Sequence, residues 1–365
     1  MSGRHKEKRV VKYWDDECCL IDGHFQIPIP FKQGVSFPNN RQQALQRLKS
    51  LRTSLHKREM FLVYDQEIQS LLRKGYAEPA ADTEASTRVW YLPHHVVLNP
   101  KKPGKVRIVF DCAARFLGES LNDKCLSGPD LINSLLHVLI RFRQYNFAFS
   151  ADIEGMYYQV VIPEHERDVL RFLWFNESSD VVEFRMTRHV FGGVWCASSA
   201  IYALHESVNE SVSTDVRNVV FRSFYVDDCL TSAPTEKKLM DLALGTKGVL
   251  QKNGFRLTKF VANSQKLMHA LPTSDIAMGK EEIITESRIL GVKWDVLQDE
   301  FFFNYQFEMS ESLSRRKMLQ VISSIYDPLG LISPMMVRAK VLLQFAVRNK
   351  CAWDEDVPKV LLQDW

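Results

Sequence analysis

Leucines recur at helical spacing near the start of the chain, in residues 41–58. The same segment contains six Lys and Arg residues and no acid. This pattern predicts an amphipathic helix whose outer face is basic and whose inner face is formed by Leu45, Leu48, Leu51 and Leu55.

Two further helices are predicted near the C-terminus. Residues 309–328 combine an N-cap serine with a proline stop. In residues 333–348, Ser333 is predicted to be the N-cap and Pro334 the first helical residue.

Residues 146–152 predict a β-strand, because large and small side chains alternate along this segment instead of recurring at helical spacing. Large aromatic side chains fall on one face, and the other face carries Ala148, Ser150 and Asp152. A lone buried carboxylate is costly, so Asp152 on a face of small residues suits an open cleft. The alternatives are a solvent-facing strand end and an N-cap for a helix over 153–161.

The segment FRSFYVDDCL (221–230) places two adjacent carboxylates inside a predicted pair of strands over 219–232. A plain hairpin turn is one explanation. Strict alternation predicts Asp227 on one face with Tyr225, and Asp228 on the other. Should Asp227 face Asp152, repulsion at ~4 Å would cost roughly 4 kcal/mol at an effective dielectric near 20. Mg²⁺ or Mn²⁺, which prefer carboxylate oxygens, would remove that cost.

Composition limits the class of protein. The 365 residues are 45% hydrophobic and 25% charged, which is ordinary for a globular chain, and no apolar run is long enough to span a membrane. Seven cysteines without a CxxC pair suggest free thiols in a reducing, intracellular compartment. We therefore expect neither secretion nor a membrane partner.

Positive charge is clustered although the net charge is only +3. Besides residues 41–58, basic clusters occur at 99–107, which is predicted to be a loop between strands, and at 252–259. Repeated basic patches favour a polyanion partner, because neutralising phosphates releases counterions.

The ordered motifs resemble a reverse transcriptase. FSADIEGMYYQVVI around Asp152 and YVDD at 225–228 are similar to motifs A and C of that family. The segments VRIVFDCAARF, FGGVWCASSA, GFRLTKF and RILGVKW resemble the fingers motif, motif B, motif D and the primer-grip hairpin. With HFQIPIPF, RVWYLPHHVVLNP and SSIYDPLGLISP, the chain over roughly residues 20–350 resembles the polyprotein of BEL/Pao-type long-terminal-repeat retrotransposons.

The resemblance implies an α+β fold, the right-hand polymerase: fingers, a palm whose antiparallel sheet carries the YVDD hairpin, and a helical thumb. The implied divisions are an N-terminal extension (1–40), fingers (41–118 and 163–190), palm (119–162 and 191–300), and thumb with the start of a truncated connection region (301–365).

It also implies an RNA-directed DNA polymerase with two Mg²⁺ ions, which Mn²⁺ can replace. Asp152, Asp227, Asp228 and the carbonyl of Ile153 would hold the ions, about 3.5–4 Å apart. Lys259 would protonate pyrophosphate. The implied nucleotide-binding residues are Lys101, Lys102, Arg107, Tyr157, Phe191, Gly192 and Tyr225, with Tyr157 excluding ribonucleotides.

The implied partners are an RNA or DNA template–primer, deoxynucleoside triphosphates and other parts of the parent polyprotein. The expected location is cytoplasmic, in a virus-like particle when an intact element is expressed, with a nuclear location left open. The template–primer is expected to contact residues 315–317 as well as the basic helix. The chain is expected to be a fragment of a polyprotein or a truncated genomic copy.

Some features depart from the retroviral pattern. Phe191 precedes Gly192 where retroviral enzymes have glutamine, which we interpret as a trait of the subfamily. No protease or integrase zinc motif is found, and too little chain follows the thumb for a ribonuclease H domain. The acidic residues 354–356 are expected to be solvated surface. An RNA-dependent RNA polymerase and a non-catalytic, domesticated nucleic-acid-binding protein remain alternatives.

Overall fold

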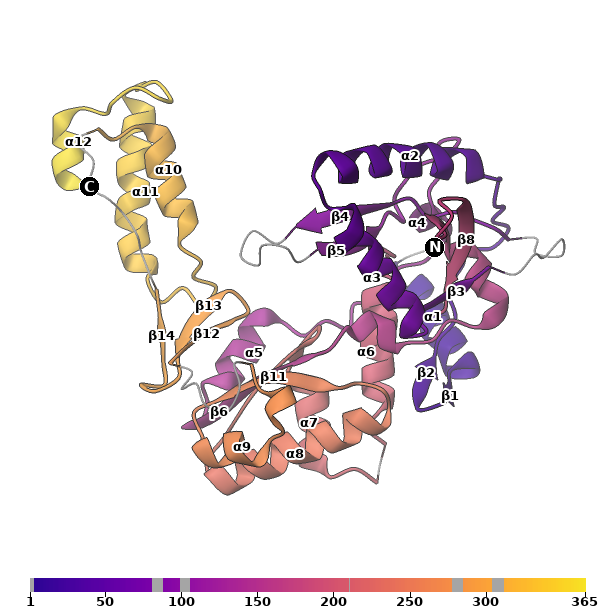
Figure 1. Cartoon of the computed structure of the whole chain (residues 1–365). Helices are drawn as coiled ribbons and strands as arrows, with labels where there is room; N and C mark the ends of the chain where they lie inside the picture. Colours follow the sequence, from indigo (N-terminus) through magenta and orange to yellow (C-terminus); the bar gives the residue numbers. More distant parts are fainter. Residues whose placement is uncertain (1–2, 81–87, 99–105, 210, 278–284, 304–311) are drawn as a thin grey trace. The chain divides into compact units, whose positions relative to one another are not determined.

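The chain divides into two compact units in the computed structural model (Figure 1), which describes residues 3–80, 88–98, 106–209, 211–277, 285–303 and 312–365. The first unit comprises Met1–Ile132, Ile153–Phe221 and Gly245–Leu257, and the second comprises Asn133–Asp152, Arg222–Leu244 and Thr258–Trp365. No helix in the described part of the chain has the length and apolar character needed to cross a bilayer.

The first unit combines helices with small antiparallel sheets. Its helices are α1 (Gly3–Glu17), α2 (Arg41–Lys57), α3 (Phe61–Arg73), α4 (Leu121–Lys124), α6 (Cys196–Glu206) and α7 (Thr214–Arg222), with 3₁₀ turns at Met156–Gln159 and Glu164–Leu170. Its strands are β1 (Cys19–Ile21), β2 (His24–Gln26), β3 (Ala77–Pro79), β4 (His94–Leu98), β5 (Val106–Phe110), β7 (Arg171–Phe175) and β8 (Val181–Met186). The sheets are β1-β2, β4-β5 and β3-β8-β7.

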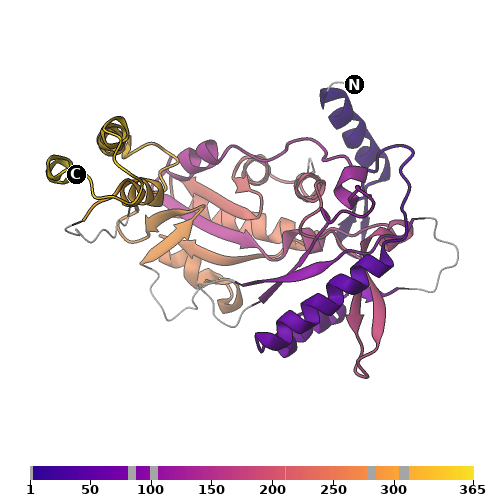
Figure 2. The same cartoon turned by 90° about the horizontal axis from the view of Figure 1, so that it is seen from above.

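The predicted basic helix is confirmed as α2. Its leucine face packs on the aromatic core of the first unit, with Leu48 and Leu55 buried and Leu45 and Leu51 partly buried. In Figure 2, α2 lies beside the β7–β8 hairpin. The core therefore orders α2 while leaving its basic residues at the surface.

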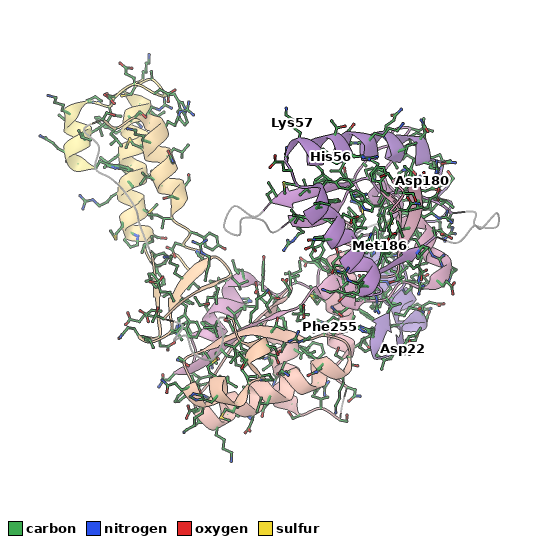
Figure 3. The ribbon with its side chains drawn as sticks, viewed as in Figure 1. Asp22, His56, Lys57, Asp180, Met186 and Phe255 are labelled. Atoms are coloured by element: carbon green, nitrogen blue, oxygen red, sulfur yellow. The ribbon has the colours of Figure 1, made fainter. Side chains whose placement is uncertain are left out.

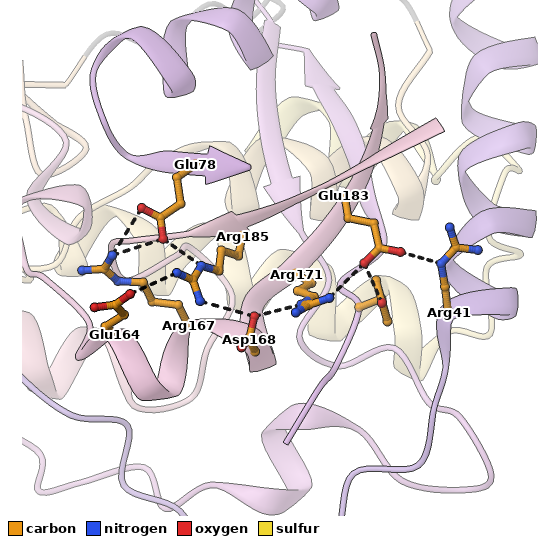
Figure 4. A network of polar contacts seen from close by, with 9 residues as sticks. Arg41, Glu78, Glu164, Arg167, Asp168, Arg171, Glu183 and Arg185 are labelled. Atoms are coloured by element: carbon orange, nitrogen blue, oxygen red, sulfur yellow. Dashed lines mark hydrogen bonds and ion pairs between the residues drawn. The ribbon is translucent and has the colours of Figure 1, made fainter. Parts of the chain in front are cut away.

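Four arginines of the first unit form a network with four acids (Figure 4). Glu183 accepts hydrogen bonds from Arg41 at 2.6 Å and from Arg171 at 3.0 Å. Arg185 joins Glu78 at 2.7 Å and Asp168 at 3.5 Å. Because each arginine forms an ion pair with a carboxylate, we infer that this cluster holds β3, β7 and β8 together and does not bind phosphate.

The second unit is built around the four-stranded sheet β11-β6-β10-β9. Its strands are β6 (Phe147–Ile153), β9 (Phe224–Tyr225), β10 (Asp228–Ala233) and β11 (Leu257–Ala262), and a second sheet contains β12 (Glu286–Ile289), β13 (Val292–Asp295) and β14 (Glu300–Phe302). Its helices are α5 (Leu135–Phe142), α9 (Gln265–Ala270), α10 (Arg315–Ser324), α11 (Ser333–Arg348) and α12 (Lys359–Asp364), with a 3₁₀ turn at Thr273–Asp275. Helix α8 (Glu236–Lys252) begins in this unit and ends in the first.

Helix α5 covers one face of this sheet. Val138, Leu139 and Phe142 on α5 form a buried cluster with Ala148 on β6 and Leu230 on β10. The predicted hairpin over 288–294 is confirmed as β12 and β13, which pack on the same cluster. This packing fixes β6 and β10, the two strands that carry the predicted carboxylates.

Two boundaries differ from the predictions. Residues 219–222 are not strand but the last turn of α7, in which Val216, Val219 and Val220 are buried at helical spacing. Helix α11 begins at Ser333, with Ile332 as the N-cap. Asp327 accepts hydrogen bonds from the backbone amides of residues 331 and 332, so these amides use an upstream carboxylate instead of a capping serine.

The C-terminal helices form a small cluster of their own. The predicted N-cap serine of α10 is Ser314, whose side chain accepts a hydrogen bond from the backbone amide of Lys317. Leu313, Met318, Ala346 and Leu361 are buried together, which joins α10, α11 and α12.

Candidate functional site: a carboxylate cluster on the second unit

The β9–β10 hairpin turns at Val226 and Asp227, because Tyr225 and Asp228 pair across it. Val226 has a φ of +58°, which the first central residue of a type II′ turn requires. A β-branched residue rarely adopts this conformation, and such strain concentrates at functional positions. The turn places Asp227 at the tip of the hairpin and Asp228 at the start of β10.

Asp228, not Asp227, lies directly opposite Asp152. The antiparallel register of β6 and β10 pairs these two residues. Strict alternation placed Asp228 on the face opposite to Tyr225, and that prediction is wrong, because the left-handed turn at Val226 interrupts the strand and Asp228 pairs with Tyr225 across it. Side chains directly opposite in an antiparallel pair lie about 4.5–5.5 Å apart at Cβ, where like charges are destabilising.

The charge on Asp228 is disfavoured in the folded chain. Burial, with the negative charges of Asp227 and Asp152, raises its pKa to about 6, and the Lys259 ammonium partly opposes this rise. All three predicted aspartates are thus close enough to interact electrostatically. They form a site of concentrated negative charge.

Lys259 is the cation at this cluster. Its Nζ lies 2.5 Å from Oδ2 of Asp152, although the two residues are far apart in the sequence. Lys259 has a φ of +55°, which costs a residue with a Cβ roughly 1–2 kcal/mol. The neighbouring Thr258 hydroxyl donates to the Asp152 carbonyl at 3.3 Å, and this contact fixes β11 against β6.

A divalent cation fits this donor set chemically. The carboxylates supply hard oxygen ligands, and burial together with two neighbouring negative charges raises the pKa of Asp228. Within the described residues, no three His, Cys, Asp or Glu side chains are already arranged around one point as metal ligands. Of the other predicted residues, Ile153 ends β6 and Tyr225 ends β9, next to the turn.

Four of the predicted nucleotide-binding residues lie together in the first unit. The rings of Tyr157 and Phe191 lie 4.6 Å apart, and the Arg107 guanidinium lies 5.7 Å from the centre of the Phe191 ring. Gly192 follows directly in the chain. Tyr158 also contacts Phe191, and burial raises its pKa to about 12. Lys101 and Lys102 lie outside the described residues.

Gly192 is required by its surroundings. Its φ is +113°, and a Cβ there would lie 2.6 Å from the Phe110 carbonyl oxygen. The side-chain Nδ2 of Asn122 donates to the Gly192 carbonyl at 3.0 Å, and its Oδ1 accepts from the backbone amide of Val194 at 3.0 Å. Sequence analysis missed Asn122, because a single asparagine carries no signal of a contact seventy positions away.

A buried histidine also holds this loop. His189 Nδ1 accepts from Trp195 Nε1 at 3.0 Å, so Nε2 carries the proton and donates to the Ile27 carbonyl at 2.9 Å. Burial lowers the His189 pKa to about 4. The imidazole therefore stays neutral and fixes both ends of the segment that carries Phe191 and Gly192.

The predicted basic residues of α10 are engaged inside the C-terminal cluster. Arg315 donates to the Cys351 carbonyl at 2.8 Å, and Arg316 forms two hydrogen bonds with the Asp354 carboxylate, at 2.6 and 3.0 Å. The same guanidinium holds the pKa of Asp354 below its usual value. These contacts indicate a structural role for Arg315 and Arg316.

Comparison with known families matches residues 314–365 to the model described as "Pao retrotransposon-like RNaseH-like domain". A search of curated proteins finds no match. The matched segment, which is described throughout, contains α10, α11 and α12 and no strand. Sequence analysis had placed the thumb here and expected no ribonuclease H domain, so the match adds a similarity that it did not anticipate.

Solved structures establish the similarity of the whole fold. Foamy viral protease-reverse transcriptase in complex with dsDNA matches all of this chain with a TM-score of 0.54 and 14% identity, over 67% of its own length. The same protein in complex with an RNA/DNA hybrid matches with a TM-score of 0.53 and 13% identity, over 43% of its length. A third structure, also with double-stranded DNA, has a TM-score of 0.51 and is covered over 56%. The chain is thus a mixed α/β protein with a fold similar to that of these viral proteins, and it spans about half of their length.

Proposed function

We propose that this chain is the polymerase core of a retroelement reverse transcriptase, which extends a primer with deoxynucleotides on an RNA or DNA template. The observation that carries this proposal is the cluster of Asp152, Asp227 and Asp228 on a strained hairpin and its partner strand. A structural hairpin gains nothing from three crowded carboxylates, one with a pKa raised to about 6. The nucleic-acid complexes of the structurally similar viral proteins support the same class of partner.

We propose that Asp152, Asp227, Asp228 and the Ile153 carbonyl hold two Mg²⁺ ions, or Mn²⁺ in their place. Bound there, the metal would favour ionisation of the primer 3′-hydroxyl and stabilise the leaving pyrophosphate. The aspartates orient the site and supply its negative charge. Lys259 balances that charge through Asp152 and, as an ammonium with 61% of its side chain exposed, can donate a proton to pyrophosphate.

The aromatic group of the first unit is proposed to bind the incoming nucleotide. Arg107 is exposed and its guanidinium is available for the triphosphate, with Lys101 or Lys102 as a second cation. Phe191 and Tyr157 present ring surfaces to base or sugar. Gly192 keeps the backbone bare, so that a nucleotide can approach closely.

The division into fingers, palm and thumb is also proposed. Sheet β3-β8-β7 joins the two segments assigned to the fingers, and sheet β11-β6-β10-β9 carries the residues assigned to the palm. The helices over 314–365 are proposed to be the thumb. The acids of 354–356 do not favour a nuclease site there, because Asp354 binds Arg316 and Glu355 accepts from the amide of Ala352.

A primer-extension assay on poly-rA/oligo-dT tests the proposal. The purified chain should incorporate dTTP in the presence of Mg²⁺ or Mn²⁺, and chelation of the metal should stop incorporation. Binding of the template–primer by a folded chain without any extension in either metal would overturn the polymerase assignment and leave the non-catalytic alternative.

A further inference from the structure

A column of stacked rings runs from the core of the first unit to its surface at the end of α2. Trp174 is fully buried, and its ring lies 5.7 Å from Phe61 with 19° between the planes. Phe61 in turn lies 4.6 Å from His56, almost parallel to it at 9°. His56 therefore covers one face of Phe61, and because His56 is exposed, its imidazole forms the outer surface of the column.

The inner end of this column is rigid. Trp174 Nε1 donates to the Asp65 carboxylate at 2.8 Å, which fixes the indole against α3. Phe61 also lies 6.3 Å from Phe175, at the end of β7. A planar surface held in this way loses little conformational freedom when another ring is added to it.

Cations surround the outer end. The Arg52 guanidinium lies 4.5 Å from the centre of the Phe175 ring, and Lys49 lies on the same side of α2 as Arg52 and His56. Lys57 follows His56 at the C-terminal end of the helix (Figure 3). The sequence of α2 contains no acid, and although Glu59 follows the helix, the cationic side chains on this face are complementary to phosphate.

We propose that this surface binds single-stranded nucleic acid, with an unpaired base stacked on His56 and the flanking phosphates held by Arg52, Lys49 and Lys57. A flat ring in a basic patch accepts the face of any base, and that face is accessible only when the base is unpaired. Within the proposed function, on which this inference rests, the unpaired part of the template is the expected occupant.

Binding of two probes to the full chain tests the inference by fluorescence anisotropy. One probe is a labelled single strand of about 12 nucleotides, within the range that such sites cover. The other is a duplex closed at both ends by non-nucleotide linkers, so that it offers no unpaired base. His56→Ala should weaken single-strand binding about five- to tenfold and leave duplex binding unchanged, since one stacked base is lost. His56→Phe restores a ring without the imidazole nitrogens and should retain the affinity.

Equal single-strand affinity of His56→Ala and the wild type would overturn the inference, and so would a loss in His56→Phe as large as that in His56→Ala. Replacing Lys8 and Lys12, exposed cations of α1 in the same unit, with Gln controls for the general loss of positive charge. Thermal unfolding of each variant verifies that it folds. The probes carry no extendable primer, so failure of this inference is separate from failure of primer extension.

Discussion

Replacing Asp228 with Asn should stabilise the folded chain while it removes a proposed metal ligand. The folded environment raises the pKa of Asp228 from the ordinary 3.8 to about 6, first through burial and then through Asp227 and Asp152. At about 1.4 kcal/mol per pH unit, this rise corresponds to about 3 kcal/mol as a ceiling. Asp228 is partly accessible to solvent, which screens its neighbours, so we expect about 1–2 kcal/mol.

The sign of this effect depends on pH. A carboxyl whose folded pKa is raised stabilises the fold below its ordinary pKa of 3.8, and that contribution is lost as the pH rises through about 6. Asn stays neutral at every pH. The advantage of the variant should therefore be present at about pH 8 and nearly absent at about pH 4.

Thermal unfolding with a chelator present measures this difference. The expected rise in Tm at the higher pH is about 2–4 °C for each kcal/mol in a domain of about 150–250 residues, and smaller in a larger cooperative unit. Asp241→Asn, an exposed substitution on α8, is the matched control and should change nothing. A Tm for Asp228→Asn at or below that of the wild type at the higher pH, or an equal rise at both pH values, would refute the crowding of charge around Asp228.

Three other outcomes follow from the same geometry. Lys259→Gln removes the cation that holds down the pKa of Asp228, so the acid limb of the pH profile of kcat/KM for extension should move to higher pH; an unmoved limb would exclude this electrostatic role. Tyr157→Ala should raise ribonucleotide use relative to deoxynucleotide use about ten- to a hundred-fold, measured by competing incorporation. Tyr158→Phe should not change this ratio. An unchanged sugar preference in Tyr157→Ala would reopen the RNA-polymerase alternative. Template–primer affinity should fall steeply with salt, and replacing both lysines of α2 with Gln should make that dependence shallower; a flat dependence in the wild type would remove the role assigned to the basic helix.

Local periodicity predicted the elements that carry the site. The leucine spacing of α2 and the alternation along β6 are signals contained within a few residues, and the structure confirms both. Ser314 as the cap of α10 is a local signal of the same kind. Such patterns are predictable because the spacing of apolar residues along an element indicates which of its faces is buried. The hairpin of β12 and β13, which the structure also confirms, was implied by the family resemblance.

Features that depend on a backbone exception or on distant contacts were not predictable in this way. Alternation placed Asp228 on the face opposite to Tyr225, whereas the two residues pair across the turn, because a valine gives no sequence signal of the positive φ of Val226. The pairing of Lys259 with Asp152 and the support of Gly192 by Asn122 join segments far apart in the chain. The network of arginines and acids in the first unit shows the same limit, since Arg41 binds Glu183 and Arg185 binds Glu78 across large separations in the chain.

The central claim is that the three aspartates catalyse nucleotide addition, and the most direct test is extension by chains that lack one of them. Asp152→Asn and Asp227→Asn should each abolish incorporation of dTTP on poly-rA/oligo-dT while template–primer affinity stays close to that of the wild type, because the substitutions remove ligands for the metal and leave the basic surfaces intact. Extension at the wild-type rate by either variant would contradict the account, and so would an equal loss of template–primer binding in both variants when each is normally folded.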